Sequence, residues 1–311
     1  MLFLDKLKEK EATLRPKFDI LFESILKNQT HSADALLINV NGFYNPEVHN
    51  WKNITEKLSP YVIGPNSEGL SEQLHYKFIH NYRSNNIAKV HYPEYLKALE
   101  YSHDKRIEID EAIEFEGTSI QLEMLVYLKI WEADAFIKKF YQATRLLHKE
   151  PYDWHFKIKE SNRDTAATGN RDNIIRLLVR DKIKTSFPGI YSAFKNAFIT
   201  QIRNSIAHSK YSFLGRNIHL NNFIASDPAS QLKNVPFDQW VNIFHDTIII
   251  YNEYLSLTQK INNHFAQIAT GNNNQVEIRI NRQDPIETIQ FANLEFRPEF
   301  QDWKWQQLNM E

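Results

Sequence analysis

The sequence contains no cysteine among its 311 residues, and this absence removes several classes of chemistry. Disulfide bonds, thiolate nucleophiles, zinc knuckles and iron–sulfur clusters all need cysteine side chains, and a chain without them is suited to a reducing cytosol. Glycine and proline are also sparse, with 8 and 11 residues, which argues against long disordered tracts. A chain of this length and composition should fold unaided around its own core.

Long hydrophobic runs are missing as well. No apolar stretch approaches the ~18 residues that a membrane span needs. The first residues, MLFLDKLKEKEATLRPK, become charged after four positions, which is too short for the apolar region of a signal peptide. These features predict a soluble protein of the cytoplasm that has no membrane partner.

Neither sign of charge is in excess, because the formal net charge is -1. The chain therefore lacks the global basic surface of a non-specific nucleic-acid binder, and any nucleic-acid contact must be local. No glycine-rich phosphate loop is present, which argues against an NTPase or a nicotinamide enzyme. Histidines such as His75, His80 and His103 show no HExxH spacing, so we expect neither a metal nor another cofactor.

Apolar residues at helical spacing dominate the chain. Residues 2–27 show this pattern, and Pro16 is predicted to divide them into two short helices. The apolar stretch 119–148 has hydrophobic side chains on nearly every helical face, so we expect one central, enclosed helix. Further helices are predicted for residues 31–39, 46–59, 67–82, 93–113, 171–187 and 238–265, and for a segment that starts near residue 190 and runs into residue 206.

Period-two alternation predicts β-structure in two places. Residues 211–220 alternate around Gly215-Arg216-Asn217, which is typical of a short hairpin. In the tail, QVEIRIN and IETIQF are separated by RQDP, which predicts a two-stranded appendage. The expected fold is mainly α, with a helical N-terminal region (1–118), a helical bundle (119–267) and a β-rich C-terminal appendage (268–311).

The segment QIRNSIAHSKYSF (201–213) interrupts an apolar helix with three polar side chains. Asn204 and His208 are four positions apart and share one helical face. Arg203 precedes His208 by five positions, about 140° around the helix, so only a long side chain reaches back to the imidazole. A guanidinium beside an imidazole suits a phosphodiester, because the planar fork binds phosphate oxygens while histidine transfers protons near neutral pH.

These residues resemble a known signature. RNSIAH (203–208) is similar to the R-x(4–6)-H motif of HEPN domains, in the variant where a polar residue follows the arginine. The resemblance covers residues 119–265 and leaves out the first 118 residues and the tail. It implies a HEPN-type bundle and a metal-independent endoribonuclease in which two subunits bring their motifs into one cleft.

The resemblance also implies roles for the three residues. The RNA 2′-hydroxyl attacks the adjacent phosphorus, His208 handles protons, Arg203 stabilises the phosphoryl charge, and Asn204 orients the imidazole or contacts phosphate. Proteins of this family often act as toxins or antiviral (anti-phage, abortive-infection) effectors. The expected partners are RNA and a second copy of the chain in a homodimer, with room for an inhibitory partner protein.

Two alternatives stay open for the motif. Arginine and histidine near the last turn of a helix interact favourably with its unsatisfied carbonyls, so the trio also fits a C-terminal cap. HEPN-like modules that keep the motif also serve as non-catalytic units that bind a protein or a nucleotide, so the fold alone does not establish cleavage.

Neighbouring residues are candidates for the same site. Lys210, Tyr211 and Arg216 follow the motif and are candidates for RNA binding, with the tyrosine offering a stacking surface, although hairpin packing explains Tyr211 equally well. Glu132 and Asp134 are candidate supports for Arg203 or His208, and buried hydrogen bonding or an exposed helix edge is the favoured alternative. Arg180 belongs to a basic stripe with Arg176 and Lys184 that suits an RNA backbone, but Asp181 weakens its field and makes a solvated face the better account.

Overall fold

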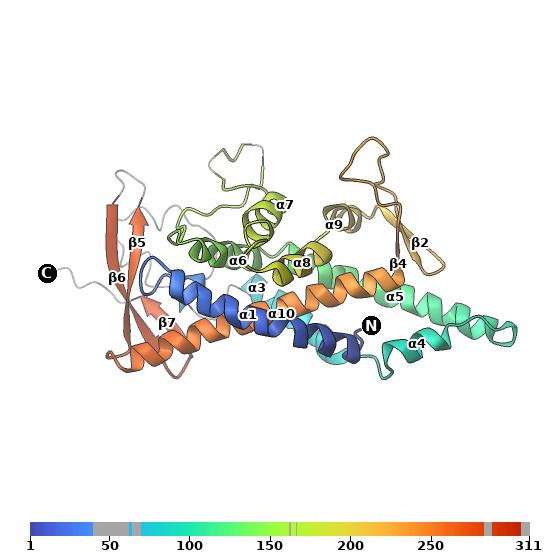
Figure 1. The fold of residues 1–311 in the computed structure, drawn as a ribbon, viewed down its shortest axis with the longest axis horizontal. Coiled ribbons are helices and arrows are strands. Elements are labelled where there is room, and N and C mark those ends of the chain that lie inside the picture. Colours follow the sequence, from blue (N-terminus) through green and yellow to red (C-terminus); the bar gives the residue numbers. More distant parts are fainter. Residues whose placement is uncertain (40–61, 64–69, 162, 166, 283–287, 306–311) are drawn as a thin grey trace. The chain divides into compact units, whose positions relative to one another are not determined.

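The structure, a computed structural model, describes residues 1–39, 62–63, 70–161, 163–165, 167–282 and 288–305, and it is mainly helical (Figure 1). The predicted predominance of helix is therefore confirmed. In chain order the elements are α1 (Leu4–Asn28), η1 (Leu36–Asn39, a 3₁₀ helix), β1 (Val62–Ile63), α3 (Leu70–Asn85), α4 (Tyr92–Ala98), η3 (His103–Lys105, 3₁₀), α5 (Arg106–Trp131), α6 (Asp134–Leu147), α7 (Arg171–Asn173), η4 (Ile174–Arg180, a π-helix), α8 (Pro188–Ala197), α9 (Thr200–Ala207), β2 (Tyr211–Leu214), β3 (Asn217–Leu220), β4 (Asn234–Pro236), α10 (Phe237–Thr270), β5 (Gln275–Arg282), β6 (Thr288–Arg297) and β7 (Asp302–Trp305).

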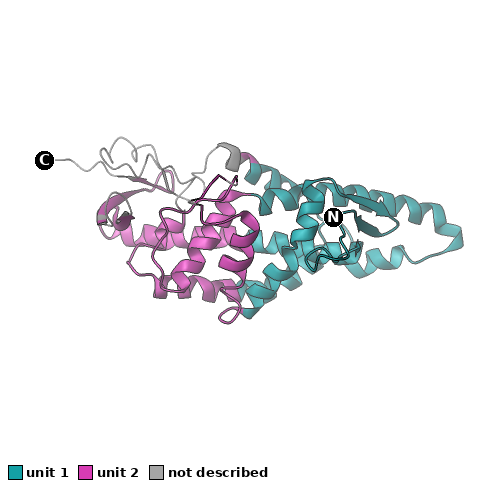
Figure 2. Cartoon of the chain, turned by 90° about the horizontal axis from the view of Figure 1, so that it is seen from above, with its two compact units in different colours: residues 1–16, 75–132, 188–252 teal, residues 17–74, 133–187, 253–311 magenta. Residues whose placement is uncertain are grey.

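The chain forms two compact units, each assembled from three separate segments (Figure 2). The first unit contains residues 1–16, 75–132 and 188–252, and the second contains residues 17–74, 133–187 and 253–311. Helices α1 and α10 therefore contribute to both units. The boundaries expected at residues 118 and 267 fall inside α5 and α10.

The core of the first unit forms around α5. The buried Trp131 ring packs against Phe194 of α8, with ring centroids 5.9 Å apart, and its indole donates a hydrogen bond to Thr247 of α10. The indole of Trp240, also in α10, donates a 2.7 Å hydrogen bond to the buried carboxylate of Glu123. Buried polar groups are stable only when they are paired, so these bonds fix the alignment of α5 with α10.

A small antiparallel sheet completes the first unit, with strand order β2-β3-β4. Gly215, at φ +51°, makes the tight turn between β2 and β3, where a side chain would be strained. The register pairs Tyr211 with Leu220 and Leu214 with Asn217, so the hairpin predicted for residues 211–220 is confirmed. Strand β4 continues directly into α10.

His245 lies in the core of the first unit, with no exposed surface. The backbone N–H of Phe3 donates a 3.0 Å hydrogen bond to its Nε2 atom, which must therefore be unprotonated. Its Nδ1 atom then carries the proton and donates to the Val241 carbonyl at 2.7 Å. Burial lowers the pKa of His245 from 6.5 to about 4, so the folded protein holds the ring neutral.

We expect acid to destabilise the first unit through this ring. Because the pKa of His245 is lower in the folded state, the unfolded chain takes up the proton first, and stability falls as the pH drops from 6.5 towards 4. A shift of this size is worth about 3 kcal/mol. The free energy of unfolding, measured with urea across this pH range, should fall in the wild type and in His103→Ala, which removes an exposed histidine. It should change much less with pH in His245→Gln. The same pH dependence in all three proteins would contradict this prediction.

The second unit combines helices with a four-stranded antiparallel sheet of order β1-β7-β6-β5. Helix α6 buries Phe136 and Phe140, and the Phe136 ring packs against Tyr254 of α10 at 5.1 Å. On the sheet, Trp303 is buried, and its indole donates a 2.8 Å hydrogen bond to Asn262 of α10. The sheet therefore packs on the C-terminal half of α10.

Several predicted helix boundaries are wrong, and each has a local cause. Pro16 does not divide α1, which is continuous from Leu4 to Asn28. Proline removes one intrahelical hydrogen bond, but Pro16 and Ala12, whose carbonyl would have been the acceptor, are both exposed, so water satisfies that carbonyl. Helix α5 also continues through residues 114–118, where a break was expected. A glycine inside a helix costs about 1 kcal/mol, and the packing of the buried Gly117 against Phe237 outweighs this cost.

The long helices predicted around residues 132 and 198 are each two helices. Ala133 is extended and separates α5 from α6. A break in a helix is recognised where the position of its apolar face shifts, and a segment with apolar residues on nearly every face shows no such shift. Ile199 is extended and separates α8 from α9. There the buried Tyr127 hydroxyl donates to the Ala197 carbonyl at 3.1 Å and accepts from the Ile199 N–H, so a residue 70 positions away satisfies the broken helix.

The remaining predictions vary in outcome. The helix expected over 238–265 is confirmed by α10, and that over 67–82 by α3. The pattern at 171–187 forms α7, the π-helix η4 and turns, and the pattern at 31–39 forms turns and η1. The helix predicted for 46–59 lies outside the described residues. The tail sheet has four strands instead of two, because β7 and the distant β1 are too short to show an alternating pattern.

Candidate functional site

The polar motif lies at the C-terminal end of α9, in the first unit. After Ala207 the chain leaves the helix through Ser209, which has a left-handed φ of +52°. The Ser209 N–H donates to the Ile206 carbonyl at 3.1 Å, and the Lys210 N–H donates to the Ser205 carbonyl at 2.7 Å. This pair of bonds is the Schellman motif, built here on serine instead of the usual glycine. The backbone alone therefore satisfies the carbonyls of Asn204, Ser205 and Ile206 in the last turn of the helix.

His208 is the terminal residue of this turn, and its side chain is exposed. Its backbone N–H donates to the Asn204 carbonyl at 3.1 Å. Within the described parts of the chain the imidazole makes no hydrogen bond and no ion pair. The ring therefore does not cap the helix carbonyls, which the neighbouring N–H groups occupy, and it remains accessible from solvent.

Arg203 is held in place by two oxygen atoms. Its Nε donates to Glu132, at the end of α5, and its Nη1 donates to the Asn204 side-chain oxygen at 2.7 Å. The guanidinium is partly exposed, and among the described residues its Nη2 group has no hydrogen-bond acceptor. A guanidinium carries five N–H donors, so donors directed away from Glu132 and Asn204 remain for an anion.

Two of the expected supporting roles can now be placed. Glu132 contacts Arg203 directly, as one of the sequence interpretations required. Asn204 contacts Arg203 and not the imidazole, so in this structure it orients the guanidinium. Asn204 still lies one helical turn before His208, on the same face of α9.

The β-sheet of the first unit is attached to the motif turn. The Asn221 N–H donates to the Lys210 carbonyl at 2.9 Å, so the first paired residue of the hairpin base directly follows the turn after α9. The Lys210 side chain is exposed beside the motif. Tyr211 is partly buried, and its ring contacts the Phe213 ring edge-on at 5.8 Å, so hairpin packing accounts for this tyrosine.

Arg216 lies at the far end of the hairpin and is fully engaged there. It donates two hydrogen bonds to the buried Glu116 carboxylate, at 2.9 and 3.0 Å, and one to Asp238 at 2.9 Å. Burial lowers the pKa of Arg216, but the bonds and charges of Glu116 and Asp238 outweigh it and hold the pKa above its ordinary range. Arg216 therefore fastens the hairpin turn to α5 and α10 and is separated from Lys210 by the length of β2.

Arg180 and Asp134 belong to the second unit. Arg180 donates a 2.7 Å hydrogen bond to its neighbour Asp181 and is only 15% exposed. Asp134 accepts two hydrogen bonds from Arg171 of the same unit, at 2.8 and 3.1 Å. The two residues stabilise the local structure of their own unit.

Sequence reasoning missed Glu116 and Tyr127, the two residues that position the elements around the motif. Glu116 anchors Arg216 from 100 positions away, and Tyr127 satisfies the break before α9 from 70 positions away. Each lies in an apolar helical pattern that offers no signal for its partner.

Two negative findings apply to the described residues. No group of three or more histidine, aspartate or glutamate side chains in them is arranged to hold a metal ion. None of their helices combines the length and the apolar character that crossing a lipid bilayer demands.

Comparisons with known proteins add no assignment, since no family model, no curated protein and no solved structure matches the chain.

Proposed function

We propose that this protein is a metal-independent endoribonuclease of HEPN type whose catalytic residues are Arg203 and His208. The observation that carries the proposal is the unused imidazole at the end of α9. Among the described residues the exposed ring caps no helix carbonyl, while the guanidinium of Arg203, in the same motif, is held by Glu132 and Asn204 with donors to spare. A protein keeps accessible, positioned polar groups of this kind most readily where they act on a ligand.

The proposed reaction is internal transesterification of RNA. The 2′-hydroxyl gives up its proton to an imidazole and its oxygen bonds to the adjacent phosphorus. The bond from phosphorus to the 5′-oxygen then breaks, and the leaving oxygen receives a proton. Arg203 stabilises the negative charge that accumulates on the non-bridging oxygens. The products are a 2′,3′-cyclic phosphate and a free 5′-hydroxyl.

Each chain supplies one motif histidine, whereas the reaction needs both a base and an acid. We therefore place two copies of the chain around one cleft, so that a second His208 serves the opposite proton transfer. Asn204 holds Arg203, and Lys210 beside the motif attracts the phosphate backbone. In a cell such an enzyme acts as a toxin or an anti-phage effector that an inhibitory partner restrains.

The test is cleavage of RNA by the purified protein in the presence of EDTA. We expect products that end in a 2′,3′-cyclic phosphate, detected by mass spectrometry. The matched substrate control is the same sequence with 2′-O-methyl groups, which blocks the attacking oxygen and should remain intact. Intact unmodified RNA, or products with 5′-phosphate ends, would contradict the proposal.

A second candidate is a non-catalytic module that binds a protein or a nucleotide. The ion pair between Arg203 and Glu132 favours it, because this carboxylate already neutralises the cation. Under this alternative, purified protein leaves RNA intact and His208→Ala changes only association. Growth on expression of wild type and Arg203→Ala separates the two, since only a nuclease should inhibit growth in a motif-dependent way.

A further inference from the structure

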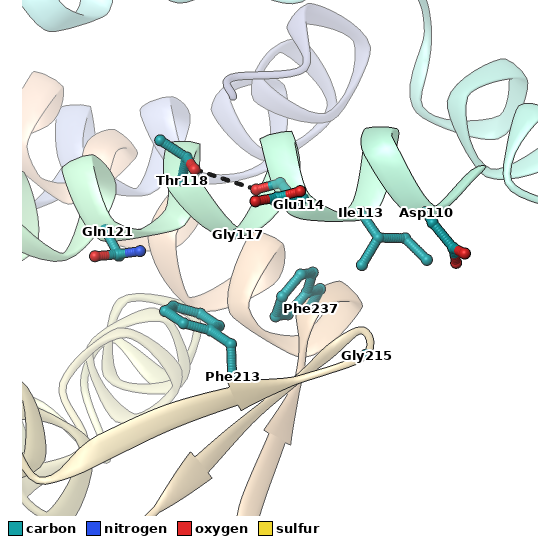
Figure 3. Close-up of a pocket in the computed structure, with 9 residues that line it drawn as sticks. All are labelled: Asp110, Ile113, Glu114, Gly117, Thr118, Gln121, Phe213, Gly215 and Phe237. Atoms are coloured by element: carbon teal, nitrogen blue, oxygen red, sulfur yellow. Dashed lines mark hydrogen bonds between the residues drawn. The ribbon is translucent and has the colours of Figure 1, made fainter. Parts of the chain in front are cut away.

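A groove on the first unit lies between α5 and the hairpin (Figure 3). Its volume is about 350 Å³, and it is open to solvent on one side. Two phenylalanine rings, Phe213 of β2 and the buried Phe237 of α10, lie beneath the helix, and Gly117 contributes no side chain to the groove at this point. The groove is lined by Asp110, Ile113, Glu114, Gly117, Thr118, Gln121, Phe213, Gly215 and Phe237.

The rim of the groove is acidic. Asp110 and Glu114 are four residues apart on α5 and therefore project from the same side of the helix. Both are exposed, and Asp110 has only a loose 3.8 Å ion pair with the exposed Arg106. Across the described residues, no cation lies within ion-pair distance of the Glu114 carboxylate. The groove thus combines apolar walls with the carboxylate of Glu114, which no cation of the described residues neutralises, and with that of Asp110, which is only loosely paired.

The surrounding surface has the same character. Residues 106–116 contain five carboxylates and one arginine. Of these five, Glu116 is the one that Arg216 binds. On the same helix Ile107, Phe115, Leu122 and Leu125 are exposed. At 100° per residue these four fall within an arc of about 80°, which lies next to the acidic rim and also contains the exposed Glu111. An exposed apolar strip beside unpaired charge is typical of a surface that another polypeptide covers.

We propose that this groove and strip bind a basic, amphipathic segment of a partner protein. A lysine or arginine side chain enters the groove, with its methylene stem against Phe213 and its cationic head at Asp110 and Glu114. Apolar residues on the same face of the segment cover the strip on α5. A second copy of this surface would bring carboxylates against carboxylates, so charge complementarity selects a basic partner over self-association.

The groove also offers a way to block the site sterically. A Cβ atom on Gly117 would lie 4.0 Å from the Phe237 ring, which is ordinary contact, so Gly117→Ala fits without disturbance. The longer side chain of Gly117→Leu would fill the groove. If Gly117→Leu fails to fold, Gln121→Trp closes the groove from an exposed position and serves the same purpose.

The test measures binding of a fluorescent amphipathic helical peptide made of leucine and lysine to the full-length protein. We expect Asp110→Lys with Glu114→Lys, Gly117→Leu and Gln121→Trp each to weaken binding about tenfold or more. Gly117→Ala should bind as wild type. So should Glu100→Lys with Asp104→Lys, which changes the net charge equally at exposed positions outside the groove. Added salt should weaken binding to wild type.

Three results would overturn the proposal. The first is that Gly117→Leu and Gln121→Trp bind the peptide as tightly as wild type. The second is that the Asp110→Lys/Glu114→Lys and Glu100→Lys/Asp104→Lys variants lose affinity equally. The third is that spermidine displaces the peptide completely. The last would show that the acidic rim binds small cations without using the apolar surface. Because none of these measurements involves RNA, they are independent of the proposed cleavage activity.

Discussion

Substituting His208 by alanine is expected to lower the rate of RNA cleavage about a thousandfold while leaving the fold intact. A positioned general acid or base is worth roughly 10²–10⁴ in rate. The same side chain is exposed and makes no hydrogen bond among the described residues, so its removal should change the free energy of unfolding by less than about 0.5 kcal/mol. Initial cleavage rates and urea unfolding of the same preparation measure both effects.

Matched variants separate chemistry from folding. His103→Ala removes another exposed histidine and should retain full activity. Arg203→Ala should lose about 10²–10³ in rate, as expected for a donor to developing charge. Arg203→Lys should recover little of it, because a single ammonium does not reproduce the planar fork held between Glu132 and Asn204. Cleavage by His208→Ala at the wild-type rate would remove this residue from the mechanism.

Substituting Arg216 by alanine is expected to cost about 3–5 kcal/mol in the free energy of unfolding. The change leaves the carboxylate of Glu116, a residue only 4% exposed, without its two hydrogen bonds inside the first unit. Lys210→Ala, which removes an exposed cation from the other end of β2, should cost less than about 0.5 kcal/mol. Urea unfolding followed by tryptophan fluorescence measures these differences, because Trp131 and Trp240 are buried in the same unit.

A double substitution tests the cause of this loss. If the penalty comes from an unpaired buried charge, Glu116→Leu combined with Arg216→Met should recover most of the stability, since apolar replacements of a buried pair are often neutral. If Arg216 contacts RNA instead, Arg216→Ala should keep wild-type stability and lose RNA affinity. That result would return Arg216 to the substrate site and contradict the structural role assigned here.

The sequence predicts local features of this fold better than distant ones. Helix α10 and the hairpin turn at Gly215 follow from periodicity and from turn chemistry within a few residues, and both are confirmed. The breaks at Ala133 and Ile199 do not follow from it. The break at Ile199 depends on the Tyr127 hydroxyl, which tertiary packing brings to the chain from a remote position.

The candidate site divides in the same way. Arg203, Asn204 and His208 are recognised from their spacing, because the helix itself brings them together. The partners of the cations do not follow from spacing: Glu132 binds Arg203, whereas Asp134, two positions later, binds Arg171. Arg216 and Lys210 are close in sequence, yet the hairpin separates them and gives them different neighbours.

The turn after α9 has a consequence for how position 208 tolerates change. Its geometry is fixed by the main-chain hydrogen bonds of Ser209 and Lys210. The side chain at position 208 should therefore have almost no effect on the free energy of unfolding. A set of substitutions at this position that omits proline, which lacks the N–H that bonds to the Asn204 carbonyl, should therefore yield folded proteins throughout. Any difference in activity among these variants would then reflect the role of the imidazole ring and not the stability of the fold.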